Sequence, residues 1–340
     1  MTGPRAFAPA GLSRYITRTP QVGGVEPCYN SPMRKRRRDI PRELPIFVFL
    51  VLLCAGLSLT TRAFASASNL KVLGSDAAAI GIIAVGMTAV IITGGIDLSV
   101  AAMLSLSTLV GGGIISRGYT LIGCGVALGV GLGCGLANGV LITRIGMPPI
   151  IATLGTLYII QSAATLISGG QCIILEPNRI AFLGTGFAPL VIMLAVFGLG
   201  AFVMGFTRAG RHVYAVGGSE ESARLVGVDP RAIKTGVYAC SGLLSALAGI
   251  VMIAIGSTFQ ANDAAGYELA AIAAVVIGGT SISGGQGSVL GTLIGVGIST
   301  VLRNGAVLVG LEARWAQAVM GAAILAAVAV DRMRRRGSAG

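Results

Sequence analysis

Charged residues are scarce in this 340-residue chain and make up only 11% of it. Soluble domains carry about 25% of such residues. Hydrophobic residues reach 54% and the mean hydropathy is +0.84. These values exclude an ordinary soluble enzyme or binding module and indicate a chain embedded in lipid.

Histidine, paired cysteines and aromatic residues are also lacking. The single histidine, His212, lies in a polar segment without companion ligands, so we expect neither a metal nor another cofactor. The six cysteines are not closely paired and four lie in apolar stretches, which argues against a disulfide framework. Aromatic residues make up 5%, with one tryptophan, Trp315, so few rings are available to stack on a tightly bound carbohydrate.

A nucleotide-binding loop of the form Gly-x4-Gly-Lys-[Ser/Thr] is missing as well. The only lysine followed by Ser or Thr is Lys234, and Ile233 precedes it instead of glycine. Clustered acids and a nucleophile motif are not found either, so we expect no catalytic residues. Any use of ATP would therefore fall to another subunit.

Long apolar stretches dominate what the chain does contain. A helix that crosses about 30 Å of hydrocarbon needs about 20 apolar residues. The pattern predicts an all-α polytopic membrane helical bundle of about ten transmembrane helices. The 52 glycines fit this prediction, because small residues let helices approach closely in lipid. The expected spans are 44–61, 76–94, 99–116, 120–143, 148–168, 187–206, 233–256, 265–283, 287–308 and 314–331.

The net charge of +12 is distributed unevenly between the expected loops. Most of the 25 basic residues lie in a tail over 1–43, in a loop over 207–234 and in a tail over 332–340. By the positive-inside rule, both termini and the 207–234 loop are cytoplasmic. We therefore interpret the charge as a topology signal and expect no nucleic-acid partner. Translation starting at Met33, with residues 1–32 a misassigned extension, is an equal alternative for the tail.

Two apolar stretches are broken by glycine pairs, at 93–99 (Thr-Gly-Gly-Ile-Asp-Leu-Ser) and 277–283 (Ile-Gly-Gly-Thr-Ser-Ile-Ser). Each follows a similar run of alanine, valine and isoleucine, which suggests an internal repeat. Matched glycine breaks in two halves of a transporter point to a substrate path. Chance similarity in so biased a composition is the alternative.

The 207–234 loop contains a short predicted helix over 219–227. Ser219 is a suitable N-cap, and Glu220 and Glu221 complement the positive helix N-terminus. Gly227 suits the left-handed position after the helix, with Pro230 as a stop. Two turns are not stable alone in water, so the helix needs a docking surface, either its own bundle or a partner.

This loop resembles the coupling element of ABC importer permeases, which has the pattern Glu-Ala-Ala, three residues, Gly. Glu221, Ala223 and Gly227 match it, whereas Ser222 departs from the second position. Over 44–331 the chain resembles the ribose-type (simple-sugar) permeases of the branched-chain amino acid/sugar permease superfamily. The stretches that carry the resemblance are 86–88 (Gly-Met-Thr) with 93–100 (Thr-Gly-Gly-Ile-Asp-Leu-Ser-Val), 148–156 (Pro-Pro-Ile-Ile-Ala-Thr-Leu-Gly-Thr), 210–218 (Gly-Arg-His-Val-Tyr-Ala-Val-Gly-Gly), and 266–269 (Gly-Tyr-Glu-Leu) with 277–280 (Ile-Gly-Gly-Thr) to Gly291.

The resemblance implies the permease subunit of an ATP-driven importer in the bacterial inner membrane, with the ten-helix fold of cobalamin-type importers. It also implies a permease homodimer, a separate ABC ATPase and a periplasmic sugar-binding protein. Permeases for nucleosides or branched-chain amino acids are the nearest alternatives, and an ion-coupled secondary transporter is a more distant one. The residues expected to couple to the ATPase are Glu220, Glu221, Ala223, Arg224 and Gly227.

Polar residues and glycines within the spans are candidates for the translocation path. For Asp97 the alternative is a helix cap, and for Asn138 and Gln161 it is hydrogen bonding between helices. Arg303 either extends to the interface or pairs with an acid. The path candidates are Thr93, Gly94, Gly95, Asp97, Ser99, Asn138, Gln161, Gly278, Gly279 and Asn304, with Glu268 at the periplasmic rim or capping its helix.

Overall fold

The computed structural model describes Gly3, residues 43–310 and Gly321. The helices discussed below belong to one compact unit, Pro41–Gly340. The expected last span at 314–331, the tail over 332–340 and nearly all of the tail over 1–43 lie outside the described residues.

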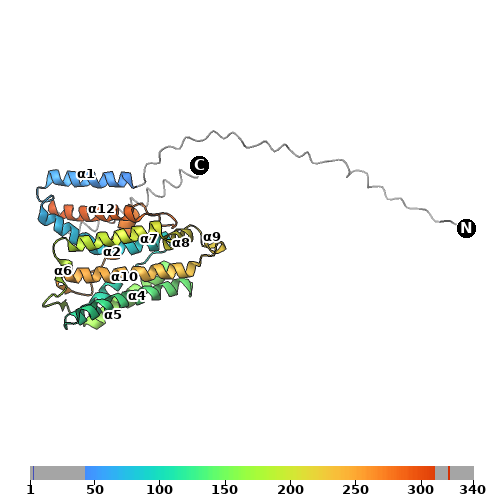
Figure 1. Ribbon diagram of the computed structural model, residues 1–340, viewed down its shortest axis with the longest axis horizontal. Helices are drawn as coiled ribbons and strands as arrows, with labels where there is room; N and C mark the ends of the chain where they lie inside the picture. Colours follow the sequence, from blue (N-terminus) through green and yellow to red (C-terminus); the bar gives the residue numbers. More distant parts are fainter. Residues whose placement is uncertain (1–2, 4–42, 311–320, 322–340) are drawn as a thin grey trace. The chain divides into compact units, whose positions relative to one another are not determined.

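Helices make up almost all of the secondary structure of residues 43–310 (Figure 1). Two short strands, β1 (Ile173–Ile174) and β2 (Thr258–Phe259), pair antiparallel, with Ile173 opposite Phe259. The helices are α1 (Leu44–Thr60), α2 (Ala67–Ile92), α3 (Val100–Ile115), α4 (Thr120–Thr143), α5 (Pro149–Ser168), α6 (Ala181–Gly184), α7 (Ala188–Phe206), α8 (Arg208–Gly218), α9 (Glu220–Leu225), α10 (Pro230–Gly256), α11 (Tyr267–Ile277) and α12 (Val289–Leu308).

Six of the helices in the described part are long and apolar enough to cross a membrane: α2, α4, α5, α7, α10 and α12. Three shorter apolar helices, α1, α3 and α11, occupy three more of the expected spans. The predicted all-helical polytopic membrane bundle is confirmed at this level, whereas the count of ten spans stays a prediction.

Several expected boundaries are wrong, for reasons visible in the caps. α2 begins at Ala67 and not near residue 76, because Ser66 Oγ accepts the Asn69 amide at 3.2 Å. α11 ends at Ile277 instead of continuing to residue 283. α8 was not predicted as a separate helix. Pro230 was expected only as a stop after the short helix. It is also the first residue of α10, a position where the missing amide donor of proline is not needed.

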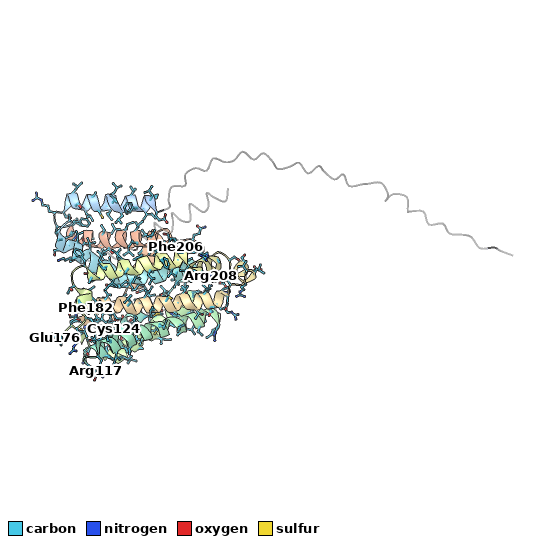
Figure 2. The ribbon with its side chains drawn as sticks, viewed as in Figure 1. Arg117, Cys124, Glu176, Phe182, Phe206 and Arg208 are labelled. Carbon is cyan, nitrogen blue, oxygen red and sulfur yellow. The ribbon has the colours of Figure 1, made fainter. Side chains whose placement is uncertain are left out.

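The two ends of the bundle differ in their loops. Figure 1 shows α8 and α9 at one end and α6 at the other. Asn178, just before α6, donates to Ser257 Oγ at 2.9 Å, so the C-terminal end of α10 lies at the α6 end. Figure 2 shows Arg208 toward the α8–α9 end and Arg117 at the opposite end.

α10 is the central helix and packs against α2, α3 and α4. Its contact with α4 is a seam of glycines in which the backbones nearly touch. A Cβ placed on Gly131 of α4 would overlap the carbonyl oxygen of Gly242 on α10 and lie 2.7 Å from Ala246 Cβ. Such close approach gives helices in lipid the dispersion contacts that hold them together.

Candidate functional site

The first glycine break closes the end of α2. Gly94 has φ +79°, a left-handed conformation that favours glycine. The Gly94 amide donates to Ile91 O at 2.9 Å and the Gly95 amide to Val90 O at 3.1 Å. These two hydrogen bonds form a Schellman motif, which ends the helix sharply.

The second break ends α11 with the same motif. Gly279 has φ +87°, its amide donates to Val276 O at 2.9 Å, and the Thr280 amide donates to Val275 O at 3.2 Å. The two terminations therefore coincide in register, with Gly279 in the place of Gly94. This correspondence supports the internal repeat, which stays a hypothesis.

A buried polar cluster lies directly after the first break. Asp97 is fully buried, and its Oδ1 accepts the Ser99 amide at 3.1 Å and the Ser99 hydroxyl at 2.7 Å. Its Oδ2 accepts the hydroxyl of Ser241, on α10, at 3.1 Å. The Ser99 amide belongs to the residue just before α3, and α3 has no side-chain cap, so Asp97 closes a local turn before α3 and is tied across to α10.

Asn138 of α4 joins this cluster. Its Nδ2 donates to Ser99 Oγ at 2.7 Å, whereas its Oδ1 is buried and accepts no hydrogen bond. Thr153 of α5 donates to Ile96 O at 3.2 Å. The break is thus held by hydrogen bonds from α4, α5 and α10, and one acceptor in it is left unsatisfied.

The other path candidates lie elsewhere. Gln161 donates to Ala261 O at 2.8 Å and to Asn262 Oδ1 at 2.7 Å, which links α5 to the loop after β2. Asn304 forms a reciprocal amide pair with Asn69, near the start of α2. Glu268 is half-buried at the start of α11, and its Oε2 accepts the Gly266 amide. The structure does not bring these three residues to the breaks.

An ion pair joins α2 and α12, and its acidic member was not predicted from the sequence. Arg303 Nη2 lies 3.7 Å from Asp76 Oδ2, so of the two interpretations of Arg303 the pairing with an acid holds. Both side chains are partly exposed. The sequence signal for this pair was an acid, Asp76, within the apolar run of α2. The expected span began at residue 76, which placed this acid at a helix end.

α8 contacts the end of α2 and the loop between α11 and α12. A Cβ placed on Gly217 would overlap Ile92 O, at the end of α2, and would lie 2.8 Å from the Gly285 amide nitrogen, in the loop before α12. Tyr214 of α8 donates to Gly287 O at 2.9 Å. The polar loop between α7 and α10 is therefore in direct contact with the segments that follow α2 and α11.

The predicted 219–227 helix is present as α9. Ser219 Oγ accepts the Ser222 amide at 3.2 Å, and Gly227 has φ +82°, as expected. Glu220 pairs with Lys234 of α10. Ala223 is buried against the bundle, whereas Leu225 is 84% exposed. Val226, which follows the helix, is also exposed, so α9 presents an unpartnered apolar end.

These features define a class of protein. The described part contains helices that can cross a membrane and two that end in glycine breaks, with an exposed helical hairpin, α8–α9, at one end. Within residues 43–310, no group of three His, Cys, Asp or Glu side chains could hold a metal ion. The class is a polytopic membrane protein.

Comparison with known proteins places the chain in a family. The family model described as "Branched-chain amino acid transport system / permease component" matches residues 72–328, and the chain belongs to this family. No solved structure matches it.

Curated relatives are similar along most of their length. The ribose import permease protein RbsC of Bacillus subtilis (strain 168) is 38% identical over 310 residues, which cover 87% of this chain and 94% of that protein. RbsC of Escherichia coli (strain K12) is 36% identical over 303 residues, covering 86% and 94%. The fructose import permease protein FrcC of Rhizobium meliloti is 35% identical over 315 residues, covering 87% and 86%.

Proposed function

We propose that this chain is the transmembrane subunit of an ATP-driven ABC importer for a monosaccharide such as ribose or fructose. The observation that carries the proposal is similarity to ribose and fructose import permeases over nearly their whole length. The chain provides the conduit, and a separate ATPase provides the energy.

The α8–α9 hairpin is the element that the ATPase would grip. Leu225 and Val226 offer an apolar contact, while Glu221 and Arg224 flank them with exposed charges. Glu220 was expected among the coupling residues, and its carboxylate pairs with Lys234, which supports a role in fixing α9 to α10. We therefore assign partner contact to Glu221, Arg224 and the apolar end, and anchoring to Glu220, Ala223 and Gly227.

A periplasmic sugar-binding protein would dock at the α6 end, which is opposite the hairpin (Figure 1). With this orientation, both termini are cytoplasmic. Two copies of the chain form the permease dimer, and each has the ten-helix arrangement of the fold. The basic residues of the hairpin support this orientation by the positive-inside rule.

The path would run beside the glycine breaks. Thr93, Gly95, Asp97, Ser99 and Asn138 are buried, so a solute can reach them only after neighbouring helices separate. The free Oδ1 of Asn138 could then accept a hydrogen bond from a sugar hydroxyl. Gly94 and Gly279 let the backbone turn at this level, and Gly278 lets the end of α11 approach Gly291 of α12. Gln161, Asn304 and Glu268 belong instead to the α6 end.

The proposal is tested in vesicles that contain the permease, its ATPase and the binding protein. We expect ATP-dependent uptake of labelled ribose or fructose, which stops when the ATPase is omitted. Uptake by the permease alone would contradict the division of labour.

The docking assignment is tested by charge reversal. Glu221→Lys should lower ATPase co-purification and transport-coupled ATP hydrolysis, with membrane insertion intact. Glu176→Lys is the matched control, because Glu176 is an exposed acid that Figure 2 places at the opposite end. Equal co-purification of the ATPase by both variants would refute the assignment.

A branched-chain amino acid is the second candidate solute, because the matching family carries that description. The same vesicles supplied with labelled leucine distinguish the two. Ligand binding by the isolated binding protein gives an independent answer.

A further inference from the structure

Three backbone segments meet at one point beside the connection between α8 and α9. Ile92 is the last residue of α2, so its carbonyl oxygen accepts no hydrogen bond from an amide of the same helix. The amide of Gly285, in the loop between the second glycine break and α12, donates to this carbonyl at 2.9 Å. Gly217, the penultimate residue of α8, lies against both groups. We call Ile92, Gly217, Gly284 and Gly285 the glycine junction.

The contact between α8 and the junction leaves no room for a side chain. A Cβ on Gly217 would overlap Ile92 O and lie 2.8 Å from the Gly285 nitrogen. On the other side, a Cβ on Gly284 would lie 3.0 Å from Gly217 O and 3.1 Å from Gly94 N. Backbone in van der Waals contact on both sides transmits displacement, because packed interiors are nearly incompressible.

α8 is also joined stiffly to α9. Ser219 is the only residue between them and caps both, since its amide donates to Ala215 O and its hydroxyl accepts the Ser222 amide. Tyr214 adds a second connection, from α8 to Gly287 O at 2.9 Å. A displacement of α9 therefore reaches α8 with little bending, and then reaches the end of α2 and the loop before α12.

We propose that Gly217 is a positioning residue for transport: its direct backbone contact with Ile92 and Gly285 makes α8–α9, the end of α2 and the loop before α12 move as one body. The inference rests on the proposed function and adds a site to it. Motion of the ATPase at α9 then reaches the end of α2 and the loop between α11 and α12 at the same step.

The test compares Gly217→Ala with Gly218→Ala in the complete complex of permease, ATPase and binding protein. Gly218 is the next residue of α8, and a Cβ there meets nothing within 4 Å. The measured quantity is the ratio of sugar transported to ATP hydrolysed. A purely structural defect lowers the amount of complex and both activities together, and it leaves this ratio unchanged.

We expect the ratio to fall about ten-fold in Gly217→Ala, within the range of known couplings between distant sites, and to stay at the wild-type value in Gly218→Ala. ATPase co-purification should be equal in both variants. An unchanged ratio in Gly217→Ala, or an equal fall in Gly218→Ala, overturns the inference. Failure of the wild-type complex to transport sugar would instead refute the proposed function.

A second pair of variants serves if Gly217→Ala does not assemble. Tyr214→Phe removes the hydrogen bond to Gly287 O and keeps the ring, and Tyr158→Phe makes the same change on an exposed residue of α5. The ratio should fall in the first variant only. Equal ratios in the two would overturn the inference.

Discussion

The glycine seam between α4 and α10 gives a quantitative prediction about stability. Gly131 and Gly133 lie two residues apart on α4, but only Gly131 faces α10. A Cβ on Gly131 would lie 2.7 Å from Ala246 Cβ and overlap Gly242 O, whereas a Cβ on Gly133 meets nothing within 4 Å. Alanine at the two positions thus separates helix propensity from packing.

The magnitudes follow from these contacts. Replacing glycine by alanine in a helix favours the helix by about 1 kcal/mol, equally at both positions. Carbon atoms prefer separations of about 3.5–4.0 Å, so the 2.7 Å contact forces the helices about 1 Å apart. Overpacking of this kind costs about 1–3 kcal/mol. We expect Gly131→Ala to be less stable than Gly133→Ala by that amount.

The assay is a reversible unfolding titration with SDS in mixed micelles, followed by circular dichroism. Gly133→Ala should unfold at the same or a higher SDS fraction than the wild-type protein, and Gly131→Ala at a lower one. If the two variants unfold together, α4 and α10 are not packed backbone to backbone, and the seam is refuted.

The stability of three further variants is measured in the same SDS titration. Ser241→Ala leaves one oxygen of the buried Asp97 carboxylate without its donor, and we expect a loss of about 1–3 kcal/mol; wild-type stability would contradict the cluster. Glu220→Gln removes an exposed ion pair with Lys234, so stability should fall by less than about 1 kcal/mol and by less still in high salt. Asn304→Leu breaks an interhelical amide pair and should cost about 0.6 kcal/mol, at most about 1.7, and a gain would show that the pair is unfavourable.

The membrane architecture could be predicted from the sequence because hydropathy acts over a whole span. Local caps were predictable as well. Ser219 caps α9 and Pro149 begins α5, because these signals depend on residues only a few positions apart. The separate helix α8 was not predicted, because it is short and amphipathic and its caps, Thr207 and Ser219, lie in a polar segment without a long apolar run.

The candidate site was predicted in part. Asp97, Ser99 and Asn138 do lie together, since two of them share a loop and the third is polar in an apolar helix. Ser241 was missed, because serine is common in such helices and only the fold brings it to Asp97. Gln161 lies apart from this cluster, since its hydrogen-bond partners are about a hundred residues away in the chain, and its place on the path stays a prediction.

The separate roles of the glycines could not be predicted from the sequence. The chain has 52 glycines, and their number alone indicates close helix packing. Geometry separates three roles: Gly94 turns the backbone after a helix, Gly131 lets two helices touch, and Gly217 lets α8 lie against the end of α2 and the loop before α12. These roles predict different losses. A methyl group on Gly131 acts on a contact inside the bundle, so it lowers stability and leaves the transport ratio of the folded protein intact. A methyl group on Gly217 separates α8 from these two segments at the edge of the bundle, so it uncouples transport at a smaller cost in stability.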